Sequence, residues 1–211
     1  MAIQNILPDP FNKITDAGEV DNTNGDAGPG FASVKLSSEQ PIMRDRTNSG
    51  RLITRAAAYH KWSIDISYNP LTKEEFSPVY NFLLHKQGSL KPFFVSLPQY
   101  RNQGITDKTV SSDAVAGSTT LYCTTTGITP GALFRITDSQ DSNHTKAYMV
   151  TRVGTNNITV TPGLAKFVNA GATIDFTAPT IKVIQTSDVQ EYSLGTNNLY
   201  SFSLKLEEVS N

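Results

Sequence analysis

Few side chains in this sequence have the types and spacing that enzyme or metal chemistry needs. The three histidines, His60, His85 and His144, lie far apart and show neither HxH nor HxxxH spacing, which argues against a zinc or iron site. The sequence also lacks a phosphate loop, a GxGxxG pattern and a GxSxG nucleophile elbow. We therefore predict no catalytic, cofactor-binding or metal-binding residues, and no cofactor.

The remaining reactive groups have simpler structural interpretations. Cys123 is the only cysteine, which excludes internal disulfides, and its strand-like surroundings predict a small core residue rather than a nucleophile. Asp138 and Asp141 are a conceivable carboxylate pair, but the polar loop around them offers no desolvation to separate their pKa values. Asp21 opens an acidic stretch, yet Ala32 stands where a calcium-binding EF-hand needs glutamate, so a plain extended arm is favoured there.

The composition excludes several classes of protein. The chain has 211 residues, of which 38% are hydrophobic and 18% charged, and its abundance of Thr, Ser and Asn favours β structure. A net charge of −1 argues against a protein that grips nucleic acid with a basic surface. The start, MAIQNILPDPF, lacks the features of a signal peptide, and no apolar run is long enough to cross a bilayer. We expect assembly in a cytoplasm, with no membrane partner.

Arginine is concentrated in one predicted β-hairpin. Two strand-like pieces, PIMRDR and RLITRAAAY, flank the turn Thr47-Asn48-Ser49-Gly50. One interpretation is a solvated hairpin, and the other is a hairpin that docks onto an acidic surface of a partner chain, because arginine favours interfaces. The candidate residues for a contact between subunits are Arg44, Arg46, Asn48, Arg51 and Arg55.

A strand, a helix and a second strand are predicted between Trp62 and Pro98. WSIDISY alternates apolar and polar residues, Thr72 and Glu75 stand in capping-box register, and KPFFVSLP reads as another apolar strand. Pro78 leaves two alternatives, a helix kinked at the proline or one that begins at Ser77. The matching apolar patterns predict a shared core of Trp62, Phe76, Tyr80, Leu83, Phe94 and Phe202.

The pattern of predicted secondary structure changes after Pro98. Short β segments about ten residues apart, separated by glycine and asparagine, predict a small barrel inserted at residues 105–180. The alternating strand YSFSLKLEE then returns to the first domain, which comprises residues 31–104 and 181–211, and residues 1–30 form a polar arm. The predicted fold class is mainly β (α+β), a β-sandwich with one packed helix plus the inserted small β-barrel.

These motifs resemble a known family. The segments WSIDISY, LTKEEF, KPFFVSLP and YSFSLKLEE, with the hairpin RTNSGRLITRAAAYHKW before them, are similar to the tail-tube-like domain of long-tailed bacteriophages. The similarity is greatest to distal tail proteins and related minor tail proteins of the tail tip or baseplate hub. It covers residues 31–211, and GSTTLYCTT and GALFRIT look like small barrels grafted onto phage structural proteins.

The resemblance implies a structural role without enzymatic activity. Such domains assemble side by side into a six-membered ring whose sheets join around a lumen for DNA, and ring closure pairs otherwise open sheet edges. The expected partners are further copies of the chain and other tail tube and tip proteins, with DNA only in transit. The expected location is the tail of the virion, in a ring that adapts the tube to the tip complex.

Two functions from other classes stay open. The barrel could bind host polysaccharide through an aromatic platform of Tyr122, Tyr148 and Phe167, although barrel core is the favoured explanation for these residues. A tail-associated hydrolase is the other alternative, and the missing carboxylate pair in an apolar setting counts against it.

Overall fold

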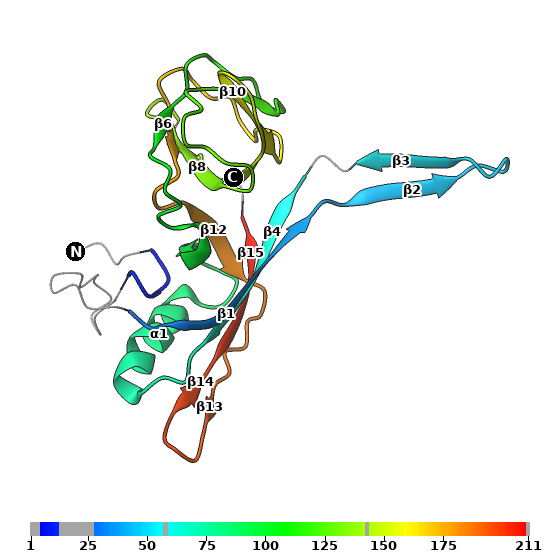
Figure 1. Ribbon diagram of the computed structural model, residues 1–211. Helices are drawn as coiled ribbons and strands as arrows, with labels where there is room; N and C mark the ends of the chain where they lie inside the picture. Colours follow the sequence, from blue (N-terminus) through cyan, green and yellow to red (C-terminus); the bar gives the residue numbers. More distant parts are fainter. Residues whose placement is uncertain (1–4, 13–27, 57–58, 142–143, 210–211) are drawn as a thin grey trace.

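The computed structural model describes residues 5–12, 28–56, 59–141 and 144–209 (Figure 1). The fold is mainly β with one α-helix, and its two large sheets are strongly curled. The fold class predicted from the sequence is therefore confirmed. The acidic stretch around Asp21 lies outside the described residues.

The first large sheet contains five antiparallel strands. Their order is β1, β4, β15, β12, β5, so the C-terminal strand lies in the middle of the sheet. Alternation in β4 buries Trp62, Ile64 and Ile66 on one face and leaves the polar residues between them on the other. The strand bounds are β1 (Phe31–Glu39), β4 (Lys61–Tyr68), β5 (Phe93–Ser96), β12 (Thr180–Gln185) and β15 (Ser203–Glu208).

The helix α1 (Lys73–Lys86) packs on the apolar face of this sheet. Thr72 and Glu75 form the predicted capping box, with the Thr72 amide donating to Glu75 Oε2 at 2.9 Å. The helix contains Pro78 in its interior, so the alternative start at Ser77 is wrong. It ends where Gln87 and the following glycine adopt positive φ, as the C-terminal glycine pattern predicts.

The core between helix and sheet matches the prediction except at β5. Trp62, Phe76, Leu83 and Phe202 are buried, and Tyr80 packs against them half-buried. Phe94 does not join this core, because strand alternation turns Phe93 and its alternate neighbours inward and Phe94 to the opposite face. There the guanidinium of Arg135 lies 5.7 Å from the Phe94 ring centre.

Residues 5–12, within the predicted polar arm, pack on the first sheet. The segment runs beside β5, with the Leu7 amide donating to the Phe94 carbonyl at 2.8 Å, and Leu7 is fully buried. The Tyr68 hydroxyl donates to the Pro8 carbonyl at 2.7 Å. This part of the chain therefore belongs to the same core as β4 and β5.

The second large sheet has six strands and encloses a separate hydrophobic cluster. Phe134, Tyr148 and Phe176 are the largest side chains in this cluster, and all are fully buried. Leu133 and Ala147 instead contribute to the first cluster, so the two sheets are packed against each other. The order is β6, β11, β8, β9, β10, β7, with bounds β6 (Lys108–Thr109), β7 (Thr120–Tyr122), β8 (Leu133–Thr137), β9 (Ala147–Val153), β10 (Asn157–Thr161) and β11 (Thr173–Asp175).

The remaining elements are short. A 3-10 turn η1 (Pro98–Tyr100) follows β5, and a small hairpin of β13 (Ser193–Leu194) and β14 (Tyr200–Ser201) precedes β15. In the part of the chain that the structure describes, no helix combines the length and hydropathy of a membrane span.

Candidate functional site

The arginine hairpin consists of β2 (Ile42–Arg46) and β3 (Leu52–Ala56). Figure 1 shows it projecting away from both large sheets as a two-stranded ribbon. The predicted turn is present, with the Gly50 amide donating to the Thr47 carbonyl at 2.8 Å and Gly50 at a φ of 82°. The Thr47 hydroxyl accepts from the Arg51 amide at 3.1 Å, which ties the two strands together at the tip.

The pairing of the strands sorts the arginines onto two faces. Arg44 lies opposite Thr54 and Arg46 opposite Leu52, so these side chains share one face. Met43 lies opposite Arg55 on the other face. The hairpin thus presents arginine on both faces, in each case beside an apolar side chain.

The apolar side chains of the hairpin are unusually exposed. The exposed fractions are 69% for Met43, 54% for Leu52, 52% for Ile53 and 48% for Ile42. A two-stranded ribbon has no core of its own, and the pairing places Ile42 and Leu52 on one face and Met43 and Ile53 on the other, so both faces expose apolar side chains that a partner could cover. Sequence reasoning missed these residues because adjacent apolar residues in a predicted strand, such as Ile42-Met43 and Leu52-Ile53, do not reveal whether the strand is buried or exposed.

Among the described residues, the guanidinium groups of the hairpin have no acidic partner. The ion pairs formed among the described residues involve none of the four arginines, and Asp45 accepts only the neighbouring Arg46 amide, at 2.7 Å. Asn48 is exposed at the tip of the turn. The structure therefore brings all five candidate residues into one projecting hairpin, and their role in a subunit contact stays a prediction.

A second surface, the polar sheet face, is the side of the five-stranded sheet opposite α1. Lys61 Nζ lies 2.9 Å from Glu207 and 3.3 Å from Glu39, and Lys35 lies 3.9 Å from Asp65. These carboxylates raise the pKa of Lys61, with Glu207 contributing most. Four lysines and three carboxylates share this face through strand alternation: Lys35, Lys61, Lys182, Lys205, Glu39, Asp65 and Glu207.

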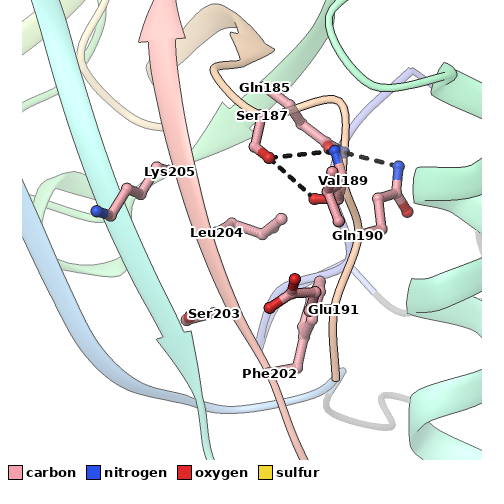
Figure 2. A pocket seen from close by; sticks show the side chains of 9 residues that line it. All are labelled: Gln185, Ser187, Val189, Gln190, Glu191, Phe202, Ser203, Leu204 and Lys205. Carbon is pink, nitrogen blue, oxygen red and sulfur yellow. Dashed lines mark hydrogen bonds between the residues drawn. The ribbon is translucent and has the colours of Figure 1, made fainter. Parts of the chain in front are cut away.

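A small pocket of about 40 Å³ opens between β15 and residues 185–191 (Figure 2). Gln190 Nε2 donates to the Leu83 carbonyl at 3.0 Å and to Gln185 Oε1 at 3.4 Å, which fixes both amides at its wall. Glu191 is the single carboxylate in its lining, which contains no histidine or cysteine. The pocket therefore does not supply the pair of carboxylates that glycoside hydrolysis requires.

The other candidate reactive groups have structural roles. Cys123 is buried in the barrel core, and burial raises the pKa of its thiol. Asp138 Oδ2 accepts from the Asn169 amide at 3.0 Å and side chain at 2.9 Å, so it fixes a loop. Among the described residues, no group of three or more His, Cys, Asp and Glu side chains could hold a metal ion.

The predicted sugar-binding platform of three aromatic residues is wrong for one of them, Tyr148. Tyr148 is fully buried, and its hydroxyl accepts from the Ala165 amide at 3.0 Å inside the barrel. Tyr122 and Phe167 are 48% and 44% exposed. Because Tyr148 stacks on Phe134 in the core, the three rings do not form one exposed surface.

Comparison with known proteins relates this chain to the distal tail proteins of phages. The family model described as distal tail protein pb9, A domain, N-terminal, matches residues 7–100, which contain the hairpin, α1 and three strands of the first sheet. The distal tail protein pb9 of Escherichia phage T5 is 29% identical over 170 residues, covering 75% of this chain and 76% of that protein. By these two similarities the chain is a phage distal tail protein related to pb9.

Proposed function

We propose that this chain forms a closed ring of six copies at the phage tail tip and adapts the tail tube to the tip complex. The observation that carries the proposal is the projecting hairpin, which exposes arginine beside apolar side chains and finds no acidic partner among the described residues. A neighbouring copy in the ring, or the adjacent ring, would cover it. Arginine suits such a contact because its planar guanidinium group can form two hydrogen bonds with one carboxylate. The aliphatic part of its side chain also packs on apolar surface.

The polar sheet face is proposed to line the lumen. Its lysines are close to balanced by carboxylates, and three of its ion pairs are formed within the chain. On a surface whose charges are paired, few lysine ammonium groups are available to bind DNA phosphates. The release of counterions from DNA would therefore contribute little affinity. DNA could then pass without being held.

The remaining proposals follow from the same assembly. The role is structural rather than enzymatic, the partners are other tail tube and tip proteins, and the site of action is the virion after assembly in the host cytoplasm. We further propose that residues 31–104 and 181–211 form the ring domain, with residues 105–180 as an inserted barrel and residues 1–30 as an arm that joins the ring domain through residues 5–12, which pack on its sheet. The separate hydrophobic cluster of the six-stranded sheet supports an independent barrel.

Reversing the charge of two hairpin arginines should abolish ring assembly. In the double variant Arg51→Glu, Arg55→Glu, the melting temperature of the free protein should change little, because exposed charges without partners contribute little to stability. Assembly should fail because every copy in a ring repeats the defect. Electron microscopy and light scattering of purified protein would measure the assembly.

A matched control reverses two charges outside the hairpin. Lys73→Glu, Arg152→Glu makes the same change in net charge at two exposed positions, on α1 and on β9, and should assemble normally. If the Arg51→Glu, Arg55→Glu protein still formed intact rings, the hairpin would be a solvated surface and not a contact between subunits.

A further inference from the structure

The barrel and the five-stranded sheet meet at a buried junction of His60, Trp62, Lys146, Ala147 and Glu208. Lys146 Nζ donates to Glu208 Oε2 and, at 2.5 Å, to the His60 carbonyl. Glu208 also accepts from the Trp62 amide at 3.2 Å and from the Ala147 amide at 3.1 Å. The Trp62 indole donates to the Ala147 carbonyl at 3.0 Å. Strands from both sheets are thereby connected through one buried ion pair.

His60 connects this junction to the root of the arginine hairpin. Its Nε2 lies 2.8 Å from the hydroxyl of Ser38, at the end of β1, and β2 begins shortly after that residue. Its own position is at the start of β4, where the chain returns from β3. The imidazole contacts Trp62 edge to face, with ring centres 4.7 Å apart. A change at His60 would therefore reach the barrel and the hairpin root together.

The surroundings of His60 suit a neutral imidazole and oppose a charged one. Its Nδ1 is buried without a hydrogen-bond partner in the part of the chain that is described, so a proton there would have no acceptor. The charge that acts on the His60 ring is that of Lys146, which immediately precedes β9, and the Glu208 carboxylate on β15 is already bonded to Lys146. The neighbouring Lys61 pairs with Glu39 and Glu207 on the opposite face.

The directions of the pKa shifts agree with this geometry. Burial, followed by the charge of Lys146, lowers the pKa of His60. Burial raises the pKa of Glu208, although Lys146 and two backbone amides act in the opposite direction. Because the folded-state pKa of His60 lies below its unfolded value near 6.5, His60 reduces stability as the pH falls through about 6.5 toward that folded-state pKa.

We propose that His60 makes the junction acid-sensitive: protonation of its imidazole separates the barrel from the five-stranded sheet at this junction and loosens the hairpin root, while each large sheet keeps its strand pairing. The protonated imidazole needs a hydrogen-bond acceptor for its Nδ1 and a greater distance from the Lys146 ammonium, which repels it. Movement of the His60 segment toward solvent provides both. The Lys146 ammonium then loses the His60 carbonyl, and the contacts around Trp62 open.

The single tryptophan of the chain is a built-in reporter for this opening. When the pH of the intact protein is lowered from about 8 to about 5, across the ordinary histidine pKa, Trp62 emission should fall and shift to the red. The imidazole signal of His60 in NMR should titrate with the same midpoint, below that of a free histidine. Small-angle scattering should show a larger radius of gyration over the same interval, with unchanged far-UV circular dichroism.

Two matched variants separate His60 from the other titrating groups. His60→Gln keeps a polar side chain of similar length and should remove the transition, whereas His85→Gln, at an exposed position of α1, should leave it intact. A transition that persists in His60→Gln, constant Trp62 emission, or simultaneous loss of circular dichroism would overturn the proposal. If His60→Gln does not fold, the agreement or disagreement of the His60 imidazole titration with the Trp62 transition in the native protein decides the matter.

Discussion

Replacing Glu208 with leucine should destabilise the fold by roughly 3–5 kcal/mol, because removing one partner of a buried ion pair leaves the other charge uncompensated. The Glu208 side chain is fully buried and that of Lys146 is 6% exposed. The Trp62 and Ala147 amides would also lose their acceptor. Urea unfolding at neutral pH, followed by circular dichroism, would measure the change in the free energy of unfolding.

The double variant Lys146→Met, Glu208→Leu provides the decisive control. It removes both charges together, and replacing a buried pair with apolar residues of similar volume is often neutral or stabilising. Much of the loss in Glu208→Leu should therefore be recovered. The exposed pair Lys61–Glu207 offers a comparison in which Glu207→Leu should change stability little. A Glu208→Leu protein as stable as the native chain would show that the junction is open to water in solution.

Local sequence patterns were sufficient to predict most of the first sheet and its helix. Thr72 and Glu75 act through neighbouring backbone amides, so their spacing alone predicts where α1 begins. Alternation in β4 likewise follows from strand geometry without knowledge of the partner strands. The turn at Gly50 was predictable for the same reason, since its positive φ is a local requirement.

Features that depend on distant contacts were not predictable. Phe93 and Phe94 are equally apolar in sequence, and only the register of β5 against β12 decides which one faces the core. Lys146 immediately precedes β9 of the six-stranded sheet, and Glu208 belongs to β15 of the five-stranded sheet. The residues next to them in sequence do not indicate that the two side chains form a pair. The candidate arginines were visible in sequence. The exposure of the apolar residues beside them depends on the tertiary fold, in which no third strand among the described residues pairs with β2 or β3.

Replacing Phe76 with alanine should cost roughly 3–5 kcal/mol, the usual range for deleting a large aromatic side chain from a core. The Phe76 ring is 5% exposed and is stacked 4.4 Å from Tyr200 and 5.2 Å from Tyr80, with Phe202 edge-on at 6.2 Å. The cavity would open between α1 and the segment of Tyr200 and Phe202 that leads into β15. Thermal and urea unfolding would both report the loss.

Leu84→Ala is the matched control for this helix. Leu84 is 49% exposed on the same helix, so its truncation removes little buried surface and should shift the melting temperature only slightly. The contrast between the two variants separates loss of core packing from a general effect on α1, because alanine is the best helix former and neither change weakens helix propensity. If Phe76→Ala melted at the same temperature as Leu84→Ala and the native protein, α1 would not be packed on the sheet in solution, and the aromatic cluster around Tyr200 would contribute nothing to the fold.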